Sequence, residues 1–134
     1  MKLLRRLLFW QAAVWTAAGL ALIAFPKPIL MSLFEQRHFV EDAWVRIAGV
    51  MAVGLAMLEV LVAQRLEDLW WFSWAFAITT AGVGVVVLAN AAFGVDPESS
   101  VLLWWLLSAV ATAFTAGLLW GMARAGQERP FPDS

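Results

Sequence analysis

Two ionisable residues, Arg46 and Glu59, stand inside otherwise apolar stretches of this chain. Charged side chains are costly in hydrocarbon and often mark ion pathways or buried contacts, so both are candidates for function. Glu59 has no basic residue three or four positions away, and its carboxyl group must either carry a proton or find a partner on another helix. The partners that we consider are Gln11, Ser73, Arg5 and Arg65. The sequence does not decide between two roles for Glu59, which are a proton or cation site and a hydrogen bond that packs two helices together.

Arg46 follows Asp42 by four residues, which is the spacing of an ion pair along one helix face. Its long side chain can reach out to the membrane interface, or it can contact an anion or a lipid headgroup. The chain has one histidine, His38, which falls in a predicted loop. A haem site with two histidine ligands is therefore excluded within this chain.

Sequence motifs for catalysis are missing. The chain has no GxSxG, no HExxH, no P-loop and no glycine-rich dinucleotide motif, and its zero cysteines exclude thiol catalysis and iron–sulfur ligation. The hydroxyl groups of the predicted third and fourth helices are expected to bond to backbone or to neighbouring helices. These residues are Thr79, Thr80, Ser108, Thr112 and Thr115. We expect a protein that is not an enzyme, with no catalytic residue and no metal site.

The elements that position these residues follow from composition. Of 134 residues, 63% are hydrophobic and 14% charged, and the mean hydropathy is +0.79. Four apolar stretches cover residues 7–25, 43–63, 69–92 and 101–123, and the shortest is about 28 Å long as a helix at 1.5 Å per residue. We predict an all-α integral-membrane four-helix bundle of up-down-up-down topology. It forms one domain, 1–126, followed by a loose tail, 127–134.

Charges near the helix ends predict the orientation. Six basic residues fall on the side of the N-terminus and three on the other, which favours a cytoplasmic location for both termini. The six are Lys2, Arg5, Arg6, Arg65, Arg124 and Arg129, and the three are Lys27, Arg37 and Arg46. The first outer loop contains Pro28 and an apolar face beginning at Ile29, so we expect a short helix lying in the interface there.

Small residues recur at four-residue spacing and predict helix contacts. On the second helix they are Ala48, Ala52 and Ala56, and on the fourth they are Ala109, Ala113, Gly117 and Gly121. The first helix carries Ala13, Ala17 and Ala21, and the third carries Ser73, Ala77 and Ala81. Such stripes let helices approach closely, either within one bundle or against another subunit. Most of the nine tryptophans fall near the predicted helix ends, and Trp15 alone lies deep.

The motif Phe25-Pro26-Lys27-Pro28, followed by Trp44-Val45-Arg46-Ile47-Ala48-Gly49 and then Gly54-Leu55, resembles small uncharacterised bacterial four-helix membrane proteins. The layout is similar to that of the DoxX-like group, in which an arginine with a following glycine opens a helix. The resemblance implies a bacterial four-helix membrane protein. It implies no particular activity, because that group has no single accepted one.

From these observations we expect a non-enzymatic accessory subunit or assembly factor of a larger bacterial inner-membrane complex. Its expected partners are membrane lipids and either other membrane subunits or further copies of itself. The net charge of −1 offers no basic stripe for nucleic acid. The tryptophan-rich faces would suit a bound lipid, quinone or carotenoid-like pigment, and the sequence selects none of them. The alternative is a small homo-oligomeric transporter or channel with Glu59 as its proton or cation site.

Overall fold

A computed structural model of the chain describes residues 2–33, 43–94 and 101–128. These residues are 97% helical and contain no strand, which confirms the all-α prediction. Four helical stretches are long and apolar enough to cross a membrane, as predicted. Their bounds are Lys2–Ala24, Ala43–Gln64, Leu66–Gly94 and Leu102–Gln127.

Within these stretches the helices are α1 (Lys2–Ala24), α3 (Ala43–Gln64), α5 (Ser73–Ala89) and α6 (Leu102–Glu128). Shorter elements lie between them: α2 (Pro26–Pro28), α4 (Leu66–Leu69), the 3₁₀ turn η2 (Trp70–Phe72) and two π-helical turns, η1 (Ile29–Leu33) and η3 (Asn90–Gly94). Because α6 runs through Gln127 and Glu128, these two residues belong to a helix and not to the predicted tail.

Local sequence explains where α1 ends and α3 turns back. Pro26 disfavours helical dihedral angles at the residue before it, and Phe25 takes φ −131° and ψ 56°. After α3, Arg65 leaves the helix with φ −117° and ψ 41°, while its carbonyl accepts a hydrogen bond of 3.0 Å from the Leu69 N–H. The chain therefore turns tightly into α4 and α5.

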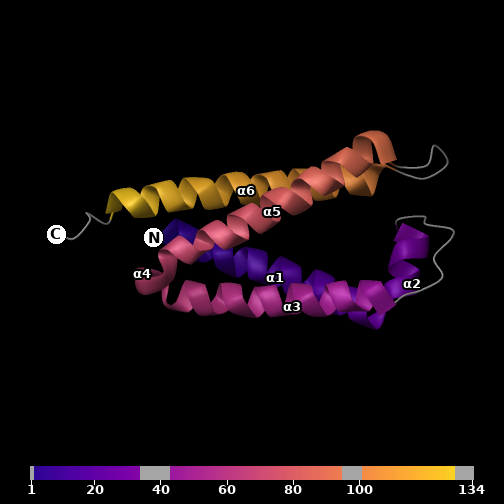
Figure 1. Cartoon of the computed structure of the whole chain (residues 1–134), viewed down its shortest axis with the longest axis horizontal. Coiled ribbons are helices and arrows are strands. Elements are labelled where there is room, and N and C mark those ends of the chain that lie inside the picture. The colour runs from indigo at the N-terminus through magenta and orange to yellow at the C-terminus, as the bar shows by residue number, and fades with distance from the viewer. Residues whose placement is uncertain (1, 34–42, 95–100, 129–134) are drawn as a thin grey trace.

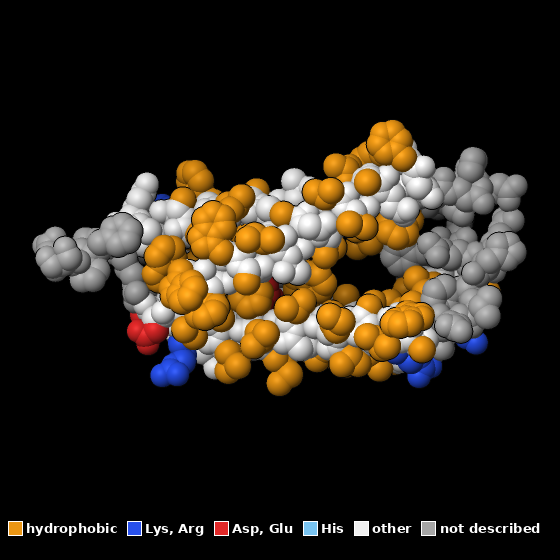
Figure 2. All heavy atoms as spheres, in the orientation of Figure 1, with side chains coloured by type: hydrophobic (Ala, Val, Ile, Leu, Met, Phe, Trp, Pro, Cys, Tyr) orange, Lys and Arg blue, Asp and Glu red, His pale blue; other side chains and the backbone are white. Residues whose placement is uncertain are grey.

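The long helices associate in two pairs, α1 with α3 and α5 with α6 (Figure 1). The pairs converge at the end where α1 begins and α6 ends, which we name the closed end, and diverge toward the other, which we name the open end. Figure 2 shows an opening between the pairs toward the open end, flanked by hydrophobic side chains. In Figure 1, α2 runs across the direction of the long helices at the open end.

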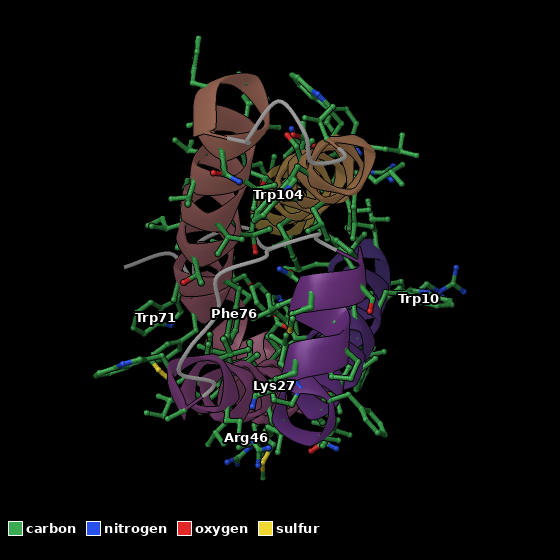
Figure 3. All side chains as sticks on the ribbon, turned by 90° about the vertical axis from the view of Figure 1, so that its right-hand side faces the viewer. Trp10, Lys27, Arg46, Trp71, Phe76 and Trp104 are labelled. Carbon is green, nitrogen blue, oxygen red and sulfur yellow. The ribbon has the colours of Figure 1, made fainter. Side chains whose placement is uncertain are left out.

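The buried core lies at the closed end. It contains residues from the beginning of α1, the end of α3, α4, the beginning of α5 and the end of α6. These are Leu4, Leu8, Val62, Ala63, Leu66, Phe76, Ala77, Leu118, Met122 and Ala125. Figure 3, which looks along the bundle, places Phe76 among the helices, whereas Trp10 and Trp71 point outward. One cluster of apolar contacts therefore holds the two pairs together.

The predicted small-residue stripes make only part of these contacts. Ala52, Ala56 and Gly121 are buried and Gly117 is half-buried, whereas Ala48, Ala109 and Ala113 are exposed. A four-residue step exceeds the 3.6-residue helical turn, so the stripe rotates by about 40° at each step and leaves the contact face. For Ala48, Ala109 and Ala113, which are exposed, the other expected role, contact with another subunit, stays open.

The stripe predicted on the first helix also follows the contact face only in part, since Ala21 is half-buried. Ala13 and Ala17 are exposed, and the buried residues of α1 are Leu4, Leu8, Gln11, Ala12 and Gly19. At Gly19 the backbones of α1 and α3 approach so closely that a Cβ atom would stand 2.7 Å from the carbonyl oxygen of Gly49. A close contact between α1 and α3 therefore rests on a pair of glycines.

Candidate functional site

Glu59 lies where three helices meet. Glu59 belongs to α3 and faces Gln11 of α1, and Thr80 of α5 lies beside Gln11. All three side chains are buried, with exposed fractions of 1%, 1% and 3%. Its position on the same face as Ala52 and Ala56 directs it into the α1–α3 contact, as its spacing predicts. The side chain thus faces protein, and water does not reach it in this conformation.

The amide of Gln11 connects Glu59 to two further side chains. An indole N–H can only donate, so the Gln11 atom that lies 3.1 Å from Trp15 Nε1 is the amide oxygen. The amide nitrogen then donates a hydrogen bond of 3.1 Å to Glu59 Oε1. The Thr80 hydroxyl lies against the same amide oxygen and 2.7 Å from the Phe76 carbonyl. Gln11, Trp15, Glu59 and Thr80 form a buried polar cluster across α1, α3 and α5.

Two buried oxygen atoms near the closed end have no hydrogen-bond partner among the described residues. They are Glu59 Oε2 and the hydroxyl of Ser73, which is fully buried. Of the four predicted partners of Glu59, Gln11 forms a hydrogen bond with it. Arg5 instead donates from Nε to the Ala63 carbonyl at 2.9 Å and from Nη2 to Glu67 Oε1 at 2.5 Å.

Arg46, the second candidate, lies at the open end, and its side chain is exposed. It contributes to a pocket of about 300 Å³ together with the turn that follows α1. The other lining residues are Ala24, Phe25, Pro26, Lys27 and Pro28. Glu59 and Arg46 lie near opposite ends of α3 and so cannot form one site. Asp42, the predicted partner of Arg46, and His38 lie outside the described residues.

The hydroxyl groups of α5 and α6 mostly bond to their own helices, as predicted. Thr79, Thr112 and Thr115 each donate to the carbonyl four residues earlier, at 2.8 Å, whereas the single proton of the Thr80 hydroxyl is donated to the Gln11 amide oxygen. The bonds to carbonyl groups satisfy the hydroxyl proton within one helix. Within the part of the chain that the structure describes, no group of three or more His, Cys, Asp or Glu residues could hold a metal ion.

Sequence reasoning found Glu59 and named Gln11 among its four possible partners, and it left open whether Thr80 bonds to its own helix or to a neighbour, but it missed the role of Trp15. The signal for Trp15 was its depth, since an indole N–H far from the interface needs an acceptor within the protein. No comparable signal marked Thr80, because a threonine that bonds to its own helix and one that contacts a neighbouring helix look the same in a sequence.

Comparison with protein-family models, with curated proteins and with solved structures finds no match for this chain. The similarity to the DoxX-like group stays a prediction from the motifs around Pro26 and Arg46.

Proposed function

We propose that the chain is a non-enzymatic accessory subunit or assembly factor of a larger complex in the bacterial inner membrane. Its four spans cross in up-down-up-down order with both termini in the cytoplasm, and the segment from Pro26 to Leu33 lies in the outer interface. The basic residues at the closed end and the crosswise direction of α2 support this topology.

The observation that carries the proposal is the outward direction of small residues. Ala109 and Ala113 on α6 are exposed, as are Ala13 and Ala17 on α1. Lipid chains pack equally well against large and small side chains on an outward face. Small side chains, in contrast, allow another helix to approach closely. These outward faces therefore fit contacts with helices of other membrane subunits.

The state of Glu59 also supports a structural role. An acid that marks an ion pathway needs contact with water, and Glu59 is 1% exposed and bonded to Gln11. Its bond joins α1 to α3, and the Gln11 contact with Thr80 extends it to α5. We assign this polar cluster to the alignment of the helix pairs.

Purification in a mild detergent followed by native mass spectrometry tests the proposed function. A subunit or assembly factor is recovered with other membrane proteins in a fixed ratio. Recovery of the chain alone, or only as a homodimer without a cofactor, counts against it.

The unpartnered Glu59 Oε2 favours one second candidate, a homo-oligomeric transporter or channel that binds a proton or cation at Glu59. Such a protein would need a conformation in which water reaches the carboxyl group. Under this alternative, Glu59→Gln abolishes proton-coupled uptake in proteoliposomes and leaves the helical content unchanged. Under the accessory-subunit proposal, the same variant has no effect on flux.

A further inference from the structure

We infer that the two helix pairs swing as rigid bodies about the closed end, and that the hydrogen bond from Thr80 to Gln11 favours the position in which they are joined. The α1–α3 pair and the α5–α6 pair lie together at the closed end and diverge toward the open end (Figure 1). Figure 2 shows the opening that this divergence leaves between them. The inference is independent of the proposed function.

The order of the elements places the link between the pairs at the closed end. Residues 25–42 connect α1 with α3, and residues 90–101 connect α5 with α6, so each of these connections stays within one pair. The two pairs are connected to each other through residues 65–72, which contain α4 and η2. In this turn Arg65 and Leu69 leave helical dihedral angles, with φ of −117° and −116°. Residues at the ends of elements can absorb a rotation between two packed units.

Each pair is closely packed toward the open end as well. A Cβ atom added at Gly19 of α1 would stand 2.7 Å from the Gly49 carbonyl oxygen of α3. In the other pair, a Cβ atom added at Gly84 of α5 would stand 3.2 Å from Ala111 Cβ of α6. Because the two helices of a pair approach so closely, we expect each pair to move as one body.

The pivot lies where α1 and α6 meet at the closed end. A Cβ atom added at Gly121 would stand 3.2 Å from the Leu4 Cα atom, and one added at Gly117 would stand 3.2 Å from Leu7 Cδ1. Leu4 also belongs to the buried core cluster, which joins the two pairs at this end. A rotation about this contact keeps the core and changes the distance between the pairs at the open end.

Apolar attraction contributes little to closing the opening. Hydrophobic side chains flank it (Figure 2). In a bilayer, such side chains exchange contact with lipid chains for contact with each other, so that closing the opening gains little free energy from the hydrophobic effect. Polar contacts between the pairs therefore have more influence on their separation than they would have in water.

The Thr80 hydroxyl has an acceptor in either position of the pairs. In the joined position it donates to the Gln11 amide oxygen. The Phe76 carbonyl oxygen, which belongs to the same helix as Thr80, lies 2.7 Å from the hydroxyl and can accept its proton when Gln11 moves away. The Gln11 oxygen keeps the Trp15 indole N–H, at 3.1 Å, because both residues belong to α1. Separation of the pairs therefore leaves no donor of this contact unpaired.

The bond to Gln11 is the stronger of the two that Thr80 can make. The Gln11 amide nitrogen donates to Glu59 Oε1 at 3.1 Å, and a hydrogen bond at one end of an amide strengthens the bond at the other end. A hydroxyl that bonds back to its own helix instead slightly destabilises that helix. The difference between two such hydrogen bonds changes the ratio of joined to separated molecules by roughly two- to fivefold.

Distances between spin labels in the full chain, measured by double electron–electron resonance in lipid nanodiscs, test this inference. The chain has no cysteine, so each label pair requires two introduced cysteines and no other change. Val50 of α3 and Val86 of α5 are exposed and report the separation of the pairs toward the open end. With a lever of about 33 Å, the 22 residues of α3 at 1.5 Å each, a swing of about 10° changes this separation by about 5 Å.

Three further label pairs, all at exposed positions, serve as controls. Two report distances within a helix pair and one reports the distance between the pairs toward the closed end. They are Leu20 with Val50, Val86 with Leu106, and Leu61 with Leu119. We expect a distance distribution for Val50 with Val86 that is about 5 Å wider than those of the three controls.

Thr80→Val removes the hydroxyl at almost unchanged side-chain volume. It should raise the ratio of long to short Val50–Val86 distances by roughly two- to fivefold, and Thr80→Ser, which keeps a hydroxyl, should preserve the parent ratio. Thr79→Val is the matched control, because the Thr79 hydroxyl donates to the Ala75 carbonyl at 2.8 Å. It should also preserve the parent ratio, and circular dichroism should show parent helical content in all three variants.

Three results would overturn the inference. The first is a Val50–Val86 distribution no wider than the distributions within a helix pair, which would indicate one rigid bundle. The second is an equally wide distribution for Leu61 with Leu119, which would indicate separation along the whole length instead of a swing. The third is a Thr80→Val ratio equal to that of the parent or of Thr79→Val, which would show that the bond to Gln11 does not favour the joined position.

Discussion

A single methyl group added at Gly49 should weaken the contact between α1 and α3. A Cβ atom there would stand 2.6 Å from the Gly19 carbonyl oxygen and 2.9 Å from Ile23 Cγ1. The helices cannot accommodate this methyl group without moving apart by several tenths of an ångström. The nearest clashing atom, the Gly19 carbonyl oxygen, belongs to the backbone, so no rotamer change can remove it. Overpacking of this kind costs about 1–3 kcal/mol.

Gly54, on the same helix, provides the matched control, because a Cβ atom added there meets no atom within 4 Å. Alanine is the better helix former by roughly 0.5–1 kcal/mol, and both substitutions receive this gain. The difference between Gly49→Ala and Gly54→Ala therefore isolates the cost of the clash. We expect Gly54→Ala to be neutral or stabilising and Gly49→Ala to be about 1–3 kcal/mol less stable than Gly54→Ala.

The assay is unfolding by sodium dodecyl sulfate in mixed micelles, followed by far-ultraviolet circular dichroism. Gly19→Ala should behave like Gly49→Ala, because its Cβ atom would stand 2.7 Å from the Gly49 carbonyl oxygen and 2.9 Å from Val53 Cγ2. If Gly49→Ala and Gly54→Ala unfold at the same detergent fraction, the close approach of α1 and α3 is refuted.

Four further substitutions, at three residues, test the polar contacts in the same unfolding assay. Glu59→Leu leaves the Gln11 amide nitrogen without its acceptor and should lower the free energy of unfolding by about 1–3 kcal/mol. Glu59→Gln keeps an acceptor and should lower it by less than half as much. Equal losses of stability in the two variants would contradict the hydrogen bond. Trp15→Phe keeps an aromatic ring but removes the indole N–H, so we expect a loss of about 1 kcal/mol, and an unchanged stability would argue against the contact with Gln11. Arg5→Gln removes the exposed ion pair with Glu67 and the hydrogen bond to the Ala63 carbonyl, so it should cost about 1–2 kcal/mol, and added salt should narrow the part that comes from the ion pair. A loss of several kcal/mol in that variant would show that Arg5 has a larger role than these two contacts.

The sequence was sufficient to predict the four spans, because their length and apolar composition leave the backbone no alternative to helix in a membrane. It was also sufficient to predict that Glu59 faces protein, since a carboxyl group on a lipid face would be far more costly. The sequence could not select Gln11 from the four possible partners of Glu59, because that choice depends on how α1 lies against α3.

Helix faces were harder to predict, since every side of these helices is apolar and hydrophobic periodicity gives little information. Ala13 and Gly19 are both small residues on α1, but only Gly19 lies in a contact. The choice between them depends on how α3 crosses α1, which is set by packing across the whole interface. The divergence of the two helix pairs depends likewise on where the large core residues, such as Leu4 and Leu118, gather. The pocket at Lys27 also depends on this arrangement, because it forms only where the ends of α1 and α3 meet.

The proposed role as a subunit or assembly factor is tested most directly by native mass spectrometry of the chain purified in a mild detergent, beside two variants. Ala109→Leu/Ala113→Leu adds bulk to the outward small residues of α6, and Val85→Leu/Val86→Leu adds bulk to an exposed face of α5 as a control. The account predicts that the wild-type chain and the α5 variant are recovered with other membrane subunits in one fixed ratio, while the α6 variant is recovered alone. A wild-type chain that runs alone or only as a homodimer without a cofactor would contradict it, and so would an α6 variant that keeps the complex.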